Sequence, residues 1–336
     1  MSTGHKISVA AAVTASVVAA GAAAVKGVAV NDRRRTGTTR QQARVAAALS
    51  DPSDARQRML AMSDGATVHV VERGPLDQTP IVLLHGVTLS TRVWHQALAA
   101  LGDRYRVIAL DWRGHGTSTA GRDGYGVPLL ARDLAEVLDQ LDVRGAVVVG
   151  HSMGGMALMR FCGDHPAVLA ERVGGLVFLS TAAGDVVGSS VPAFVGSAME
   201  RLIRRPAVAA RASWTAPGDF GYAMVRVTFG ARPAPVWVEQ VRHIVSQMDP
   251  AATAASIIPL ISHDARPILP HISTPALVIV GSRDRLTPPA QARAIASLLP
   301  EAQLVEIEGP GHLIMLERQA QFHRLVSRLA DRVGIS

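Results

Sequence analysis

From residue 147 the sequence reads Val147-Val148-Val149-Gly150-His151-Ser152-Met153-Gly154-Gly155. The β-branched run predicts a buried strand, and the pattern Gly-x-Ser-x-Gly leads directly into a helix-compatible segment, Met156–Phe161. This pattern is typical of a nucleophile elbow, in which a serine lies on a sharp strand-to-helix turn. Glycines on either side leave room for the strained turn. The helix N-terminus behind the serine can offer N–H groups to an oxyanion.

The composition describes a globular chain with a basic N-terminal part. Of the 336 residues, 48% are hydrophobic, which supports a large core and excludes global disorder. Cys162 is the single cysteine, so an internal disulfide and a cysteine-based metal site are excluded. Residues 1–58 hold nine basic and three acidic residues, so they carry +6 of the net charge of +7. The nearly neutral remainder predicts no nucleic-acid partner.

The N-terminal segment has the length of a membrane anchor. Residues 7–25 carry no charge, and about 20 apolar residues cross a bilayer. Arg33-Arg34-Arg35 follows, and positive charge stays on the cytoplasmic side. We therefore predict an anchor within residues 1–30, a basic linker over 31–58 and a catalytic domain in the cytoplasm. Two alternatives stay open: a secretory signal cleaved near Ala22-Ala23-Ala24, with export, or an alanine-rich helix lying on a surface.

Residues 59–336 alternate between short apolar runs and segments with helical periodicity. Strands are predicted near residues 67–72, 81–85, 106–110, 147–149, 176–180, 277–281 and 303–307, and helices near 92–101, 127–141 and 289–299. Such alternation predicts an α/β fold with a mostly parallel sheet and helices on both faces. The alternation breaks over residues 183–265, where helical stretches, prolines and most aromatics occur. We interpret this segment as an inserted helical cap.

The chemistry of a serine nucleophile requires a base, and the base requires an orienting carboxylate. Asp284 follows the strand that ends at Gly281, and His312 closes the turn Gly309-Pro310-Gly311-His312 after the last strand. The order serine, acid, histidine suits a nucleophile elbow, and sites in open α/β sheets form at the carboxyl ends of strands. Ser152, Asp284 and His312 are thus the predicted catalytic residues. Asp185, after the strand ending at Ser180, is the alternative acid.

An oxyanion hole needs two backbone donors. The N–H of Met153 is the first candidate because this residue follows the serine. Val87, in the sequence His85-Gly86-Val87 after an apolar strand, supplies the second. We expect His85, His115 and His151 to organise loops through hydrogen bonds.

Taken together, these motifs resemble the α/β-hydrolase-fold enzymes, a group with bacterial esterases, lipases, cofactor-free haloperoxidases, epoxide hydrolases and meta-cleavage-product hydrolases. The resemblance covers roughly residues 60–332. Residues 1–58 lie outside it, but an alanine-rich, arginine-containing N-terminal segment followed by such a domain resembles actinobacterial members. It rests on His85-Gly86, Asp111-x-Arg113-Gly114-x-Gly116-x-Ser118, Gly150-His151-Ser152-Met153-Gly154-Gly155, Asp284 and Gly311-His312. It implies a mostly parallel sheet of the eight-stranded type. Epoxide hydrolases and haloalkane dehalogenases carry aspartate at the elbow, so Ser152 speaks against both.

The resemblance implies a serine hydrolase that cleaves small carboxylic esters through an acyl-serine intermediate, with no metal and no organic cofactor. Perhydrolase or haloperoxidase-like activity and C–C bond hydrolysis on the same triad are the alternatives, and a catalytically silent binding protein is another. The cap aromatics suggest an apolar acyl or aromatic substrate group, unless they form the cap's own core. These aromatics are Trp214, Phe220, Phe229 and Trp237. The oligomeric state stays open.

Overall fold

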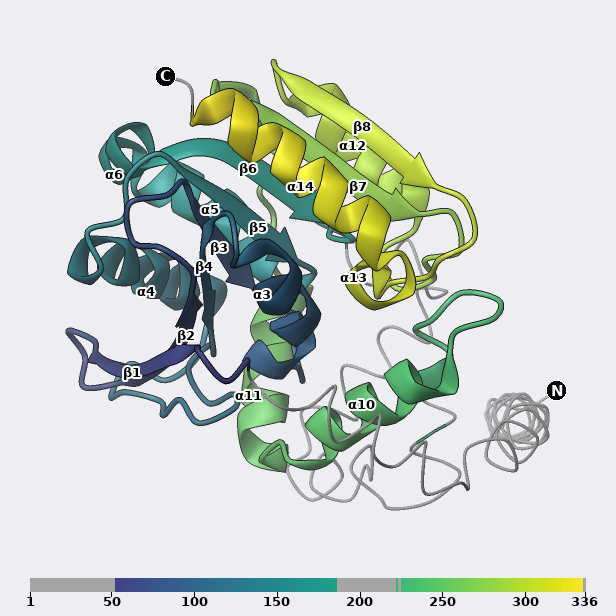
Figure 1. The fold of residues 1–336 in the computed structure, drawn as a ribbon, viewed down its shortest axis with the longest axis horizontal. Coiled ribbons are helices and arrows are strands. Elements are labelled where there is room, and N and C mark those ends of the chain that lie inside the picture. Colours follow the sequence, from purple (N-terminus) through teal and green to yellow (C-terminus); the bar gives the residue numbers. More distant parts are fainter. Residues whose placement is uncertain (1–51, 186–221, 223–224, 335–336) are drawn as a thin grey trace, which may run out of the picture.

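The computed structural model describes residues 52–185, 222 and 225–334, and within them eight strands form one sheet (Figure 1). The strand order is β1-β2-β4-β3-β5-β6-β7-β8. Strands β3 to β8 run parallel, whereas β1 pairs antiparallel with β2, and β2 with β4. The strands are β1 Arg56–Ala61, β2 Thr67–Arg73, β3 Pro80–Leu84, β4 Arg106–Leu110, β5 Ala146–His151, β6 Val173–Leu179, β7 Ala276–Gly281 and β8 Ala302–Ile307. The predicted α/β fold with a mostly parallel sheet is confirmed.

Both faces of the central strands are covered by helices. Successive side chains of a strand point to opposite faces, so Val82 and Leu84 pack with α4, α5 and α12, whereas Ile81 and Leu83 pack with α3 and α14. All four side chains are fully buried, which is why β3 reads as a continuous apolar run. The helices are η1 Thr91–Trp94, α3 His95–Leu101, α4 Val127–Gln140, α5 Met153–Asp164, α6 Pro166–Arg172, α10 Pro235–Ser246, α11 Pro250–Ile261, η2 Leu269–His271, α12 Pro289–Leu298, α13 Ile314–Glu317 and α14 Gln319–Val333.

The first strand is not among those predicted from the sequence. Strand β1 starts at Arg56, inside the predicted linker and three residues before Met59. Its side chains are almost all exposed, because β1 is an edge strand that pairs only with β2. An exposed edge strand shows no apolar alternation, so periodicity could not reveal it.

Helices α10 and α11 belong to the insertion between β6 and β7, within the predicted cap (Figure 1). The predicted anchor at residues 7–25, most of the predicted linker, Trp214 and Phe220 lie outside the described residues. Among the described residues, no single helix combines the length and apolarity needed to cross a membrane. Helix α10 and residues Ala251–Ile261 meet that standard only as a pair bent by 99°.

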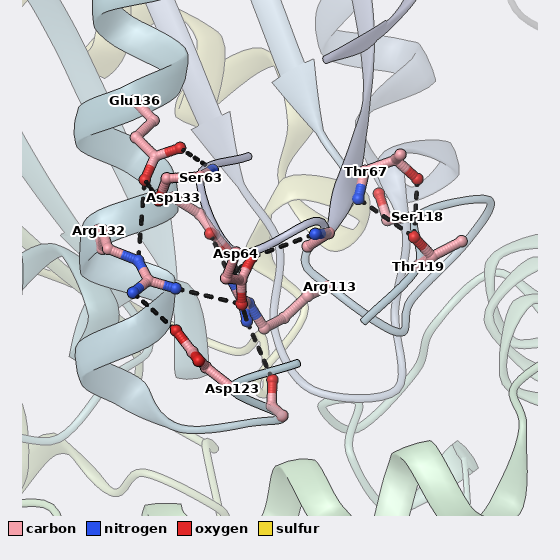
Figure 2. Close-up of polar contacts among 12 residues, drawn as sticks. Ser63, Asp64, Thr67, Arg113, Ser118, Thr119, Asp123, Arg132, Asp133 and Glu136 are labelled. Atoms are coloured by element: carbon pink, nitrogen blue, oxygen red, sulfur yellow. Dashed lines mark hydrogen bonds and ion pairs between the residues drawn. The ribbon is translucent and has the colours of Figure 1, made fainter. Parts of the chain in front are cut away.

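A buried ionic network fastens the loop after β4 to its surroundings (Figure 2). The guanidinium of Arg113 binds Asp133 of α4 through two hydrogen bonds, at 2.7 and 2.5 Å, and Asp64 of the β1–β2 turn at 2.8 Å. All three residues are at most 2% exposed. The hydrogen bond from Arg113 holds the pKa of Asp64 down at about 2, which offsets the cost of burying that carboxylate. The network thus fixes the loop that carries Trp112.

Replacing Arg113 by methionine is expected to lower the free energy of unfolding by about 3–5 kcal/mol, because the buried carboxylates of Asp64 and Asp133 lose the guanidinium that binds both, and Arg132, 3.2 Å from Asp64, compensates only in part. The control is Arg293→Met, which removes an exposed ion pair with Glu306 and should cost about 0–1 kcal/mol. Urea unfolding followed by circular dichroism measures both. Equal losses in the two variants would contradict a special role for the buried network.

Candidate active site

The backbone at Ser152 has the geometry of a nucleophile elbow. Ser152 joins the end of β5 to α5 with φ 53° and ψ −119°, a conformation that few non-glycine residues adopt. A Cβ on Gly154 would lie 2.5 Å from the carbonyl oxygen of Leu84, so only glycine lets α5 begin this close to β3. Two hydrogen bonds frame the turn. The N–H of Ser152 donates to the Leu179 oxygen at 3.0 Å, and the Thr181 hydroxyl donates to the Ser152 oxygen at 2.7 Å.

His312 and Asp284 form a buried pair at the carboxyl ends of β8 and β7. The Nδ1 atom of His312 lies 2.9 Å from Oδ2 of Asp284, and both residues are at most 5% exposed. The hydroxyl of Thr287 donates to the same Oδ2 at 2.9 Å, and the N–H groups of Leu286 and Thr287 donate to Oδ1. Burial raises the pKa of Asp284, but His312 and these hydrogen bonds outweigh it, so the pKa lies below its usual value. Asp284 is therefore an ionised carboxylate at neutral pH, suited to orient an imidazole.

The histidine lies next to the elbow. The ring of His151, which precedes Ser152, is 4.7 Å from the ring of His312, and its Nε2–H donates to the His312 carbonyl at 3.0 Å. Within the described residues, no hydrogen bond joins Ser152 to His312. Such contacts are often long without substrate and tighten in the complex. The structure therefore brings the three predicted catalytic residues to one edge of the sheet.

The loop after β3 runs against the nucleophile. A Cβ on Gly86 would lie 3.0 Å from Cβ of Ser152. The N–H of Trp112 donates to Nε2 of His85 at 3.0 Å, so the proton of this neutral, buried ring is on Nδ1, which donates to the Gly86 carbonyl at 2.7 Å. In a trans peptide the next N–H, that of Val87, points away from this carbonyl. His85 thus organises the loop, as expected from the sequence.

The alternative acid lies elsewhere. Asp185 is exposed, and its carboxylate pairs with the guanidinium of Arg266 at 2.6 Å. The described contacts of His312 include Asp284 and Thr287 but not Asp185.

Only two of the four predicted pocket aromatics can be placed. Phe229 is 4% exposed and belongs to the apolar cluster that contains Trp94 and Leu313. Trp237 of α10 is partly buried and packs against the same cluster. For Phe229 this placement favours the interpretation that it contributes to a core.

Several residues around the site had not been singled out from the sequence. Thr287 contacts both Asp284 and His312, and Glu317 binds the backbone beside His312. A threonine three residues after the acid, before Pro288-Pro289, could have drawn attention. No local pattern marks Glu317. Among the described residues, no cluster of three or more His, Cys, Asp or Glu side chains could hold a metal ion.

Comparison with known sequences supplies a family. Residues 79–319 match the profile of the alpha/beta hydrolase fold. The chain is 31% identical over 245 residues to a non-heme chloroperoxidase of Kitasatospora aureofaciens, covering 70% of this chain and 86% of the relative. It is 26% identical over 259 residues to 3-oxoadipate enol-lactonase 2 of Acinetobacter baylyi, covering 77% and 91%.

Solved structures agree with this result. A thermophilic esterase from Thermogutta terrifontis superposes with a TM-score of 0.70 at 26% identity, covering 83% of this chain and 100% of that one. The profile match spans well over half of the chain and includes all three residues of the candidate triad. The protein is therefore a member of the α/β-hydrolase fold family.

Proposed function

We propose that this protein is a serine hydrolase that cleaves carboxylic esters with an apolar acyl or aromatic group through an acyl-serine intermediate. The observation that carries the proposal is a serine on a positive-φ turn at the start of a helix, next to a buried histidine–aspartate pair. Strained backbone conformations cluster at functional sites, where the function depends on the side chain that the strained residue positions. The pair provides a base whose proton on Nδ1 is held by a carboxylate.

The proposed reaction has two balanced steps. As Oγ of Ser152 attacks the ester carbonyl carbon, Nε2 of His312 accepts its proton and passes it to the departing alkoxide, which leaves as an alcohol. Water then attacks the acyl-serine, His312 takes one water proton and returns it to Oγ, and the carboxylic acid is released. The N–H groups of Met153 and Val87 stabilise the oxyanion in both steps, and Asp284 stabilises the imidazolium.

The relatives support an ester substrate. The solved relative from Thermogutta terrifontis is described as an esterase, and the relative from Acinetobacter baylyi is named an enol-lactonase; a lactone is a cyclic ester. For the acyl group, the support is the aromatic content of the insertion, of which Trp237 is partly buried on α10.

A second candidate activity is perhydrolysis, favoured by the 31% identity to a non-heme chloroperoxidase. Hydrogen peroxide would replace water as the nucleophile in the second step, so that the acyl-serine yields a peracid and free serine. The ratio of peracid to acid formed from one ester in the presence of hydrogen peroxide separates the two activities.

A fluorophosphonate probe and a series of p-nitrophenyl esters test the proposal. We expect stoichiometric labelling of Ser152, identified by peptide mass spectrometry, and turnover that rises with acyl chain length before it falls. An unlabelled, folded protein would refute a serine hydrolase and favour a silent binding protein. Labelling of Ser152 without turnover of any ester would contradict ester hydrolysis and favour C–C bond hydrolysis on the same triad.

For the N-terminal segment we propose membrane attachment through residues 7–25, with the catalytic domain in the cytoplasm. The support is sequence alone: an uncharged stretch of bilayer length, followed by a basic cluster.

The full-length protein should sediment with membranes, and a shortened chain beginning at Asp51, which keeps β1, should remain in the supernatant with unchanged kcat. Release by high salt indicates a surface helix, and retention a span. If the full-length protein is found in the supernatant at low salt, both the surface helix and the membrane span are contradicted. If the mature protein begins after Ala24 and lies outside the cytoplasm, residues 7–25 belong to a cleaved signal.

A further inference from the structure

A single carboxylate connects the helical insertion to the loop that carries His312. Glu317 is the last residue of α13 and is partly buried. Its Oε1 accepts the N–H of Gly311, directly before His312, at 2.8 Å. Its Oε2 accepts the N–H of Gly230, which lies within the insertion between β6 and β7, at 2.8 Å. Each oxygen therefore holds a different segment, and the two segments are distant in sequence.

The backbones of these segments lie in direct contact around this carboxylate. The N–H of His312 donates to the carbonyl of Thr228 at 2.7 Å. A Cβ on Gly230 would lie 2.1 Å from the Gly309 oxygen, and one on Gly311 would lie 2.5 Å from the carbonyl carbon of Phe229. Only glycines permit this approach. Two successive N–H groups therefore have different acceptors: that of Gly311 donates to Glu317, and that of His312 donates to the insertion.

We propose that Glu317 is a positioning residue that holds Thr228–Gly230 of the insertion against the His312 loop, so that the position of the insertion determines the position of His312, the general base. The proposal rests on the proposed function for the role of His312, but the contact itself does not. Hydrogen bonds from N–H groups to a carboxylate are stronger than neutral ones. A base must be held within about 0.5 Å of its working position. A substrate that displaces the insertion would consequently move His312.

The contact can be tested without turnover by amide hydrogen exchange of Glu317→Gln. A glutamine side chain has one accepting oxygen, so one N–H of the two loses its partner. We expect faster exchange in both segments, residues 225–231 and 309–313. The matched control is Glu308→Gln in the same loop, because Glu308 is exposed and has no hydrogen bond or ion pair among the described contacts. Unchanged exchange in residues 225–231 would overturn the proposal.

Kinetics test whether the contact positions the base. We expect Glu317→Gln to lower kcat about tenfold with little change in KM, and to slow fluorophosphonate labelling by a similar factor. Urea unfolding shows whether the variant is folded. Gly230→Ala, which forces the same contact open from the insertion side, should reproduce the kcat loss and serves as the test if Glu317→Gln does not fold.

The outcomes separate this proposal from the proposed function. Faster exchange with unchanged kcat and labelling would overturn the positioning role. If the wild type hydrolyses no ester, the proposed function fails, and exchange with labelling still decides whether Glu317 positions His312.

Discussion

Ser152→Ala is expected to abolish ester hydrolysis while the fold persists. Ser152 carries the only hydroxyl placed on the strained turn, and without it no acyl-enzyme forms. Loss of the nucleophile from a triad costs on the order of 10⁶ in kcat, which leaves only the contributions of binding and the oxyanion hole. Alanine keeps the Cβ and is small enough for the turn. Initial rates with a p-nitrophenyl ester, together with circular dichroism, measure the effect.

Ser180→Ala is the matched control for this variant. Ser180 directly follows the neighbouring strand β6 at the same sheet edge, has φ 45°, and is buried. Its hydroxyl has no hydrogen-bond partner among the described residues, so its removal should change kcat by less than about threefold. Comparable losses in both variants, or near-normal turnover by folded Ser152→Ala, would refute Ser152 as the nucleophile.

Asp284→Asn is expected to lower kcat by about 10⁴, because the amide no longer selects the His312 tautomer with its proton on Nδ1. The substitution is nearly isosteric, so the hydrogen bonds from Leu286 and Thr287 to the remaining oxygen can persist. Rates with the same ester and the pH dependence of kcat/KM are the measurements. The loss of rate in Asp284→Asn should be largest for the steps of the reaction in which His312 accepts a proton.

Asp185→Asn provides the comparison. Asp185 is exposed and pairs with Arg266, so its neutralisation should change kcat only severalfold. If Asp185→Asn were the more damaging of two folded variants, the catalytic acid would lie after β6 instead of after β7.

Local sequence patterns predicted the positions of most central strands. The strand at Arg106–Leu110 was predicted with its observed bounds, and the strand that begins at Thr67 differs only by its last residue. The fully buried β4 is a continuous apolar run, and β2 alternates between buried and partly buried positions, so each can be recognised without its neighbours. Strand β1 was missed for the opposite reason: its sequence, Arg-Gln-Arg-Met-Leu-Ala, is exposed, and only pairing with β2 makes it a strand.

The sequence by itself determined the elbow, the family of folds and the order in which serine, acid and histidine follow their strands, because glycines and apolar runs act over a few residues. The tertiary structure decided which of two aspartates faces His312. It also decided that Thr287 shares the acid's oxygen and that Glu317 holds Gly230 and Gly311 together. These contacts depend on which strands are neighbours in the sheet. Strands β6 and β7 are paired in the sheet although the long insertion separates them in the sequence. Sheet order is set by burial of the whole chain, and no local pattern encodes it.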